Sequence, residues 1–337
     1  MNSAVGRSNG NGGGRAVKEQ RRRSNITCGG RAVAAISVLL LLACPRAALP
    51  AQSEGSILTS VPGSTRAAAL GGAGAALVGD AAALFANPAG IATIRHLGLE
   101  GSYEPYLEGT AISSAAMALR VTRFTVGFGA QAFDYGTEPE IVPDPATGGR
   151  RGMATGASFH PYEALAASSL VYRRGFAALG ATVKYDRQQI GAAASDAWAG
   201  DIGMAIAVFD IMALGVSVQN LGGDLGSGAL LPRRTRAGLT LNYTDPQGTY
   251  RLLTTLEGLW ERDKSAVLIQ GVEAGVVTSG VGLVGRIGYA TRPTITDASN
   301  WTFGGGVVLG RLAMDYAYRS YDVLGGGTHR VGLRWTP

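Results

Sequence analysis

A two-residue alternation of apolar with small or polar side chains restricts the fold of this chain more than any other feature, and it recurs from residue 97 onward. In AALGATVKYD, at residues 177–186, Leu179, Ala181 and Val183 alternate with small or polar residues. This period is typical of a β-strand with one apolar face. No stretch after residue 97 offers eighteen consecutive apolar residues, so none is predicted to cross a bilayer as a helix.

The alternating stretches are longer than ordinary soluble strands. They run about ten to thirteen residues, the length a tilted strand needs to cross a bilayer, whereas soluble strands average about five or six. A soluble β-sandwich would alternate in the same way, but Tyr and Trp gather at the ends of these stretches, as a membrane-interface girdle requires. A closed barrel is also the β-arrangement that pairs every backbone group in lipid.

We therefore predict an all-β fold: a closed antiparallel transmembrane β-barrel of about fourteen strands in the bacterial outer membrane, with membrane lipid around it. The predicted strands are 97–107, 111–121, 123–135, 159–172, 176–188, 197–209, 211–220, 234–244, 249–261, 265–277, 281–291, 301–310, 312–321 and 328–336. The long connections are Gly136–Ser158, Leu221–Arg233 and Arg292–Asn300, and they fall on one side. Bacterial barrels carry short periplasmic turns and longer outer loops, so we expect these connections outside the cell.

Residues 1–51 have the order of an export signal. Basic residues precede the apolar run Ala32–Ala43, and Leu49-Pro50-Ala51 follows as a cleavage site, with Ala48 as an alternative. A lipid-modified Cys44 is a further alternative. This leader carries eight of the 30 basic residues and one of the 24 acidic ones, so the rest of the chain has 22 basic and 23 acidic residues. Nucleic acid is therefore not an expected partner, because phosphate binding needs basic charge on the folded domain.

The stretch Ser64–Ile94 differs from everything after it, being nearly free of charge and rich in Gly and Ala. Asp80 is placed to cap a short helix over Ala81–Ala86. Asn87 disfavours the helical region because proline follows, and Pro88 suits the first position of the next turn. Such an irregular backbone leaves polar groups that cannot face lipid.

We therefore predict a spacer and hatch over 52–96, lying inside a barrel formed by 97–337. The hatch motif is Asp80, Asn87, Pro88, Ala89 and Gly90. Asn87 is expected to secure it most, since its side chain can bond neighbouring backbone.

The small or polar face of the strands is expected to form a polar lumen. Its predicted members are Gln131, Lys184, Glu257, Arg286, Asp315, Arg319, Arg330 and Arg334. Asp315 with Arg319, and Arg286 with Glu257, are interpreted as interior salt bridges rather than a substrate site. Gln131, Arg286 and Arg330 are expected to bond the hatch backbone.

Four blocks of the chain resemble the PorV/PorQ family and, more distantly, FadL-type outer-membrane barrels. They are ALGGAGAALVGDAAALFANPAGIA at 69–92, GVSVQNLGG at 215–223, LPRRTRAGL at 231–239 and AMDYAYRSYDVLGGGTHRVGLRW at 313–335. The resemblance implies an N-terminal plug carrying the Asn-Pro-Ala motif. It further implies a protein that binds or shuttles secreted cargo at the cell surface, as in type IX secretion, with cargo proteins or secretion-system components as its partners. The alternative it implies is a FadL-like transporter of hydrophobic small molecules.

No pattern typical of an enzyme is present. The three histidines lack metal-site spacing, both cysteines lie in the leader, and no nucleophile elbow or Walker A sequence occurs. We therefore predict no catalytic residue, metal or cofactor. The acidic residues Glu138, Glu140 and Asp144 are interpreted as part of a solvated loop rather than a cation site.

Overall fold

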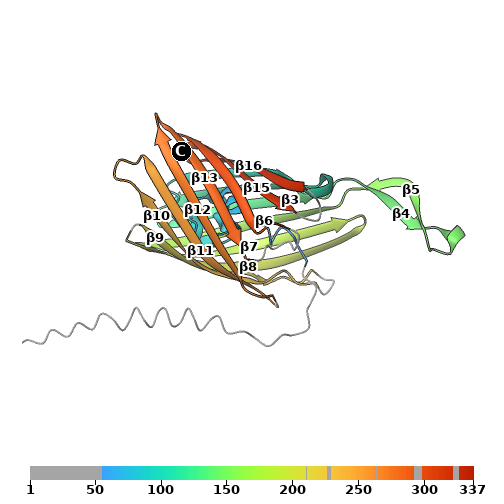
Figure 1. The fold of residues 1–337 in the computed structure, drawn as a ribbon. Helices are drawn as coiled ribbons and strands as arrows, with labels where there is room; N and C mark the ends of the chain where they lie inside the picture. Colours follow the sequence, from blue (N-terminus) through green and yellow to red (C-terminus); the bar gives the residue numbers. More distant parts are fainter. Residues whose placement is uncertain (1–54, 210, 226–228, 263, 292–297, 322–325) are drawn as a thin grey trace, which may run out of the picture. The chain divides into compact units, whose positions relative to one another are not determined.

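The chain forms a closed antiparallel β-barrel. The computed structural model describes residues 55–337 except 210, 226–228, 263, 292–297 and 322–325, so the predicted leader lies outside the described residues. The barrel has fourteen strands in the order β1-β16-β15-β14-β13-β12-β11-β10-β9-β8-β7-β6-β3-β2, closed by pairing of β1 with β16 (Figure 1). This confirms the predicted fold class.

The strand bounds agree with the predicted ones to within four residues. They are β1 (Leu97–Pro105), β2 (Ala111–Val121), β3 (Phe124–Asp134), β6 (Tyr162–Arg174), β7 (Ala177–Ile190), β8 (Ala193–Val208), β9 (Met212–Gly222), β10 (Arg234–Thr244), β11 (Tyr250–Glu261), β12 (Val267–Thr278), β13 (Val281–Ala290), β14 (Trp301–Leu309), β15 (Leu312–Tyr321) and β16 (Gly326–Trp335). A single-turn 3-10 helix, η3 (Leu107–Gly109), joins β1 to β2. The end of the barrel that carries the connections after β3, β9 and β13 is called the long-loop end, and the opposite end the turn end.

The sequence predicts the longest connection, Gly136–Ser158, as a loop without strands, and the structure differs. It contains a separate two-stranded ribbon, β4 (Glu138–Pro143) and β5 (Gly152–Phe159), joined through the short 3-10 helix η4 (Pro145–Thr147) (Figure 1). The sequence gives no signal for this ribbon, because β4 contains Pro139 and ends at Pro143. Nearly every residue of the ribbon is also exposed, which removes the alternation typical of a half-buried strand.

The two faces of the strands are those that the alternation predicts. On β7, Leu179 and Val183 are 58% and 54% exposed, whereas Thr182 and Lys184 are 2% exposed. Outward apolar residues of the other strands follow the same pattern. An apolar exterior over a polar interior is the arrangement that a barrel in lipid requires.

Residues 55–96, called the N-terminal segment below, pack against the inward faces of the strands. The segment contains α2 (Thr65–Ala69) and two 3-10 helices, η1 (Ala81–Phe85) and η2 (Pro88–Thr93). Helix α2 contacts β13 to β16, η1 contacts β1 to β3, and η2 contacts β3 and β6 to β8. Because these strands lie around the whole barrel, the segment is in contact with opposite parts of the wall.

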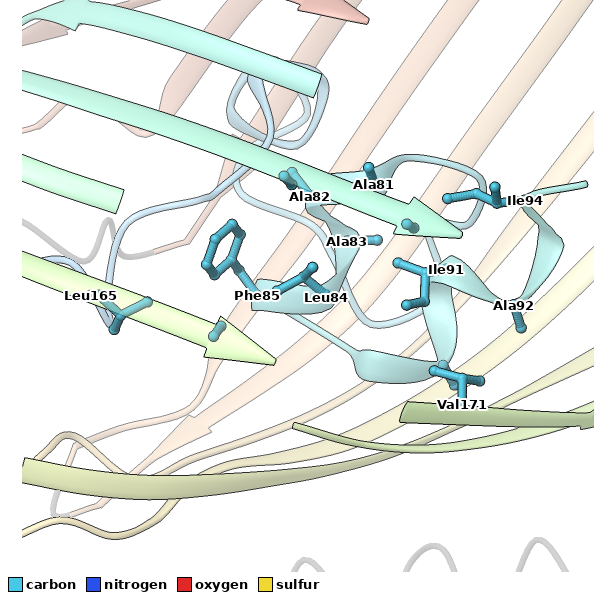
Figure 2. Packing of buried hydrophobic residues seen from close by; sticks show 14 of the residues in the cluster. Ala81, Ala82, Ala83, Leu84, Phe85, Ile91, Ala92, Ile94, Leu165 and Val171 are labelled. Atoms are coloured by element: carbon cyan, nitrogen blue, oxygen red, sulfur yellow. The ribbon is translucent and has the colours of Figure 1, made fainter. Parts of the chain in front are cut away.

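Apolar side chains of η1 and η2 meet those of β6 in one buried cluster. Figure 2 shows Leu84, Phe85 and Ile91 between the ribbon of the segment and the wall residues Leu165 and Val171. Burial of these side chains stabilises the segment against the wall. Among the residues that the structure describes, no helix is long and apolar enough to cross a membrane.

Candidate functional site

The lumen wall supplies hydrogen-bond partners for the irregular backbone of the N-terminal segment. Glu257 accepts from the amides of Gly74 and Ala75, both at 2.7 Å. Thr302 accepts from the Gly71 amide at 2.9 Å and donates to the Ala69 carbonyl at 3.0 Å. A segment without a β-ladder or a long helix thus has its polar groups paired by side chains.

Three buried wall arginines bind carbonyl oxygens of the segment. Arg330 donates to the Pro62 carbonyl at 2.5 Å, and Arg236 donates to that of Gly72 at 3.0 Å. The third, Arg234, donates to the carbonyl of Ser60 at 2.8 Å. Arg330 therefore makes the backbone contact that the sequence predicts for it.

The other two residues expected to bond this backbone do not. Arg286 directs its guanidinium to Glu273, Asp315 and the Gly305 carbonyl, all within the wall. Gln131 is buried, and its side-chain nitrogen has no hydrogen-bond partner among the residues described. Other wall residues make hydrogen bonds to the segment's backbone instead. They occupy inward positions of the same alternation, but the sequence analysis did not single them out. These residues are Glu163, Gln219, Arg234, Arg236 and Thr302.

An ion-pair network joins the segment to the wall. Arg66 on α2 binds Glu273 of β12 through Nε at 2.7 Å and Nη2 at 3.0 Å, and it reaches Asp80 at 3.2 Å. Asp80 also pairs with Arg334 of β16. Bidentate arginine–carboxylate pairs of this kind fix geometry as well as charge.

Asp80 does not act as the helix cap that its position suggested. It stands at the N-cap of η1, but its side chain makes no capping hydrogen bond. Burial raises the pKa of Asp80, yet the guanidinium groups of Arg334 and Arg66 outweigh burial, so the net shift of its pKa is downward. The carboxylate is thus used to join the segment to the wall.

The predicted salt-bridge partners inside the wall are wrong, although the residues do face inward. Arg286 pairs with Asp315 and with Glu273, each at 2.7 Å, and Glu257 pairs with Arg236 at 2.5 Å. The wall adds Lys184 with Asp201 at 2.7 Å, and Arg334 with Asp315 at 3.4 Å. Arg319 is half-buried, and its Nε has no hydrogen-bond partner among the residues described.

The Asn-Pro-Ala-Gly motif forms a compact buried turn against β8. The side-chain oxygen of Asn87 accepts from the Ala89 amide at 3.0 Å, and its nitrogen donates to the carbonyls of Ala75 at 2.6 Å and Met204 at 3.2 Å. Pro88 begins η2. A side chain at Gly90 would lie 2.8 Å from Cβ of Ala83, so this position accepts glycine alone without a shift.

Two wall glycines allow the segment to approach the strands at backbone distance. A Cβ atom on Gly215 would lie 1.8 Å from the Ala75 carbonyl oxygen, and one on Gly288 would lie 2.0 Å from the Gly71 amide. Larger residues at these positions would force the segment away from the wall.

Two cavities lie inside the barrel beside the segment. The first lies near the long-loop end, between apolar residues of β11 and β12 (Leu259, Val267 and Ile269) and the tyrosines Tyr106 and Tyr321. The second lies deeper along the segment. Both are lined by Val61, Pro62, Gly72 and Arg236, so these residues stand between them.

The described residues contain no group of three or more His, Cys, Asp or Glu side chains placed to hold a metal ion. Two of the ribbon's acidic residues serve its own structure. Asp144 accepts from the Ala146 amide at 2.9 Å, and Glu140 accepts from the Thr155 hydroxyl at 2.7 Å.

These features together define a class of protein. A closed barrel of fourteen antiparallel strands, apolar outside and polar inside, is an integral β-barrel of the bacterial outer-membrane type.

Comparison with solved structures gives the particular form of this fold. The toluene transporter TbuX of Ralstonia pickettii is similar at 13% identity, covering 82% of this chain and 98% of its own, with a TM-score of 0.53. The toluene transporter TodX of P. putida is similar at 12% identity over 81% of this chain and 96% of its own (TM-score 0.54). A FadL homologue of Pseudomonas aeruginosa is similar at 13% identity over 85% of this chain and 100% of its own (TM-score 0.50). The chain thus has the fold of FadL-type barrels. No protein-family model and no curated protein matches the sequence.

Proposed function

We propose that this chain is an outer-membrane channel for small hydrophobic molecules, and that the N-terminal segment is a hatch that closes it. The observation that carries the proposal is a lumen with two cavities separated by a segment held through polar contacts, in a fold shared with toluene transporters. The FadL-like alternative thus takes precedence over the secretion role expected from the sequence.

The first cavity is suited to receive an apolar molecule. Leu259, Val267 and Ile269 form an apolar wall, and Tyr106 and Tyr321 add aromatic surface whose hydroxyls bond one another at 3.1 Å. The charged residues Glu104, Arg236, Arg319 and Arg330 complete the lining. Small-molecule sites commonly combine an apolar concave surface with a few polar groups that fix orientation. A monoaromatic hydrocarbon, the ligand class named for the channels CymD and TodX, fits this chemistry.

Arg236 is the proposed barrier between the two cavities. Its guanidinium binds Glu257 at 2.5 Å, Gln219 at 3.0 Å and the Gly72 carbonyl at 3.0 Å. Passage from the first cavity to the second requires this arginine, or another of the shared lining residues Val61, Pro62 and Gly72, to move. Because this barrier is held by side-chain hydrogen bonds and is not part of a strand ladder, it can open without unfolding the barrel.

Uptake of radiolabelled toluene by cells that express the protein tests this function. Val267→Trp, which projects into the first cavity, should reduce uptake, whereas Leu268→Trp on the lipid face of the same strand should not. Heat-modifiable electrophoretic migration should show that both variants are folded. Equal uptake by the two variants, or no uptake above empty-vector cells, would contradict the proposal.

A second candidate is the cargo-binding role that the PorV/PorQ resemblance implies. The ribbon favours it, because Ile141 and Met153 are 63% and 47% exposed there and offer apolar contacts to a protein. Replacing residues 138–159 by a short Gly-Ser turn should then abolish display of secreted cargo on the cell surface while leaving toluene uptake intact. Normal cargo display in this variant would exclude the ribbon as a cargo site.

A further inference from the structure

Five arginines gather at the turn end of the barrel, where the N-terminal segment passes into β1. One comes from the residues just before β1, two from the end of β2 and the β2–β3 turn, and two from the end of β6, and with Thr93 and Gly175 they line one surface hollow. The five are Arg95, Arg120, Arg123, Arg173 and Arg174. The β2–β3 turn and the end of β6 are joined directly, since the Arg173 amide donates to the Arg123 carbonyl at 2.9 Å.

Arg120 and Arg173 are held in matching positions. The Nε of each donates to a carbonyl in its own turn, that of Thr122 at 3.0 Å and that of Gly175 at 3.2 Å. The Nη1 of each lies 3.4 Å from the Ala92 carbonyl oxygen. Two guanidinium groups are therefore fixed around one backbone oxygen, and each retains further N–H groups for a ligand.

No carboxylate balances this charge within the described part of the chain. The side chains of Arg95, Arg123 and Arg174 make no hydrogen bond or ion pair there. The lumen arginines are different, because Arg66 and Arg286 are each paired with two carboxylates. Five neighbouring cations repel one another and create a strong attraction for an anion. Guanidinium groups bind phosphate in two-pronged geometry.

The outer wall beside the cluster shows which phosphate compound suits it. The rings of Phe124 and Tyr172 pack with centroids 5.2 Å apart, and Phe176 in the next turn is 69% exposed. Aromatic side chains at strand ends lie at the membrane interface, where lipid headgroups are found. A ligand with a phosphate at the arginines and an apolar body at these rings would satisfy both surfaces.

We propose that this cluster binds the headgroup phosphate of an anionic phospholipid, with its acyl chains against Phe124, Tyr172 and Phe176. If the short turns face the periplasm, as in bacterial barrels, the lipid belongs to the inner leaflet. Basic pockets at membrane surfaces bind cardiolipin headgroups through the same chemistry. Because Arg120 and Arg173 also hold the Ala92 carbonyl, the bound headgroup also stabilises the end of the segment.

Native mass spectrometry of the purified protein with added cardiolipin or phosphatidylethanolamine tests the site. The wild type should retain cardiolipin in preference to phosphatidylethanolamine. Arg123→Gln with Arg174→Gln removes two exposed charges without touching the core and should weaken cardiolipin retention about 30-fold, since each charge near a lipid surface contributes about a factor of five. Arg150→Gln with Arg151→Gln, an equal charge change on the exposed turn of the ribbon, should leave retention unchanged.

Several results would overturn the proposal. Equal retention of the two lipids would show that the arginine cluster is not a cardiolipin site. Equal cardiolipin retention by the cluster variant and the wild type would show the same. Full displacement of cardiolipin by inorganic phosphate at millimolar concentration would mean that the cluster takes a soluble anion instead. Heat-modifiable migration verifies that the barrel is folded, and the single variant Arg174→Gln, expected to show about a fivefold loss, serves if the double variant does not fold.

Discussion

Arg66→Met removes the cation that ties the N-terminal segment to the wall while keeping most of the side-chain volume. Arg66 binds Glu273 at 2.7 and 3.0 Å and Asp80 at 3.2 Å, and its side chain is only 5% exposed. Loss of one partner from a buried ion pair costs about 3–5 kcal/mol. Glu273 keeps Arg286 at 2.7 Å and Asp80 keeps Arg334, so the lower figure applies.

This cost falls on the docked state of the segment, because an undocked segment leaves the carboxylates accessible to water. A loss of about 3 kcal/mol raises the ratio of undocked to docked molecules about 150-fold. Single-channel recording in planar bilayers measures this ratio as the fraction of time spent open. The variant should open far more often than the wild type.

Lys184→Met is the matched control. It also removes the cation of a buried pair, but Lys184 binds Asp201 at 2.7 Å and Asn220 at 3.2 Å, so this pair joins wall to wall. It should lower barrel stability without raising the open fraction. The reasoning fails if a folded Arg66→Met protein stays as closed as the wild type, or if Lys184→Met opens the channel equally.

Three further predictions follow from the structure. Val183→Arg, at the middle of β7 on the lipid face, should cost about 2–4 kcal/mol in a denaturant titration, whereas Leu179→Arg near the strand end should cost about 0–1 kcal/mol; equal costs would mean that the membrane midplane is misplaced. An epitope tag after Gly148 should be accessible to antibody on intact cells, and one within Asp245–Gly248 should not, with the reverse result contradicting the assigned orientation. Asn87→Ala removes three hydrogen bonds of the segment and should increase entry of small hydrophilic antibiotics, so unchanged permeability would deny this residue a closing role.

The barrel could be predicted from the sequence because its signal is local. Each strand shows its lipid face through neighbouring residues alone, so three strands, Ala111–Val121, Arg234–Thr244 and Leu312–Tyr321, were placed with their observed bounds. The same alternation assigned inward positions correctly. The ribbon between β3 and β6 gave no such signal, since both of its faces meet solvent.

The partners of the lumen charges could not be predicted, because they depend on register between strands. Arg286 stands directly opposite Glu273 in the β12–β13 pair, a fact set by the turn between them. Glu257 lies on β11, beyond β12, where Arg236 of β10 reaches it. Alternation determines which face of the sheet a residue is on, but not which residue of the adjacent strand lies opposite it. Asp80 was misassigned for a similar reason, since its two arginines lie 14 and 254 residues away in sequence.

The contact between Arg330 and Pro62 spans 268 residues, and it lies where the first and last strands close the barrel. On the other side of that seam, Ser114 of β2 donates to the Gly63 carbonyl at 2.9 Å. The earliest-made part of the folded chain is therefore completed by the last strand to be synthesised. Contacts of such long sequence separation are slow to form. Closing the seam and completing this part of the segment's anchorage therefore depend on the same last strand, so a chain that stops before β16 would retain the contacts made by β6 to β14 but would lack both the seam and the Arg330 contact.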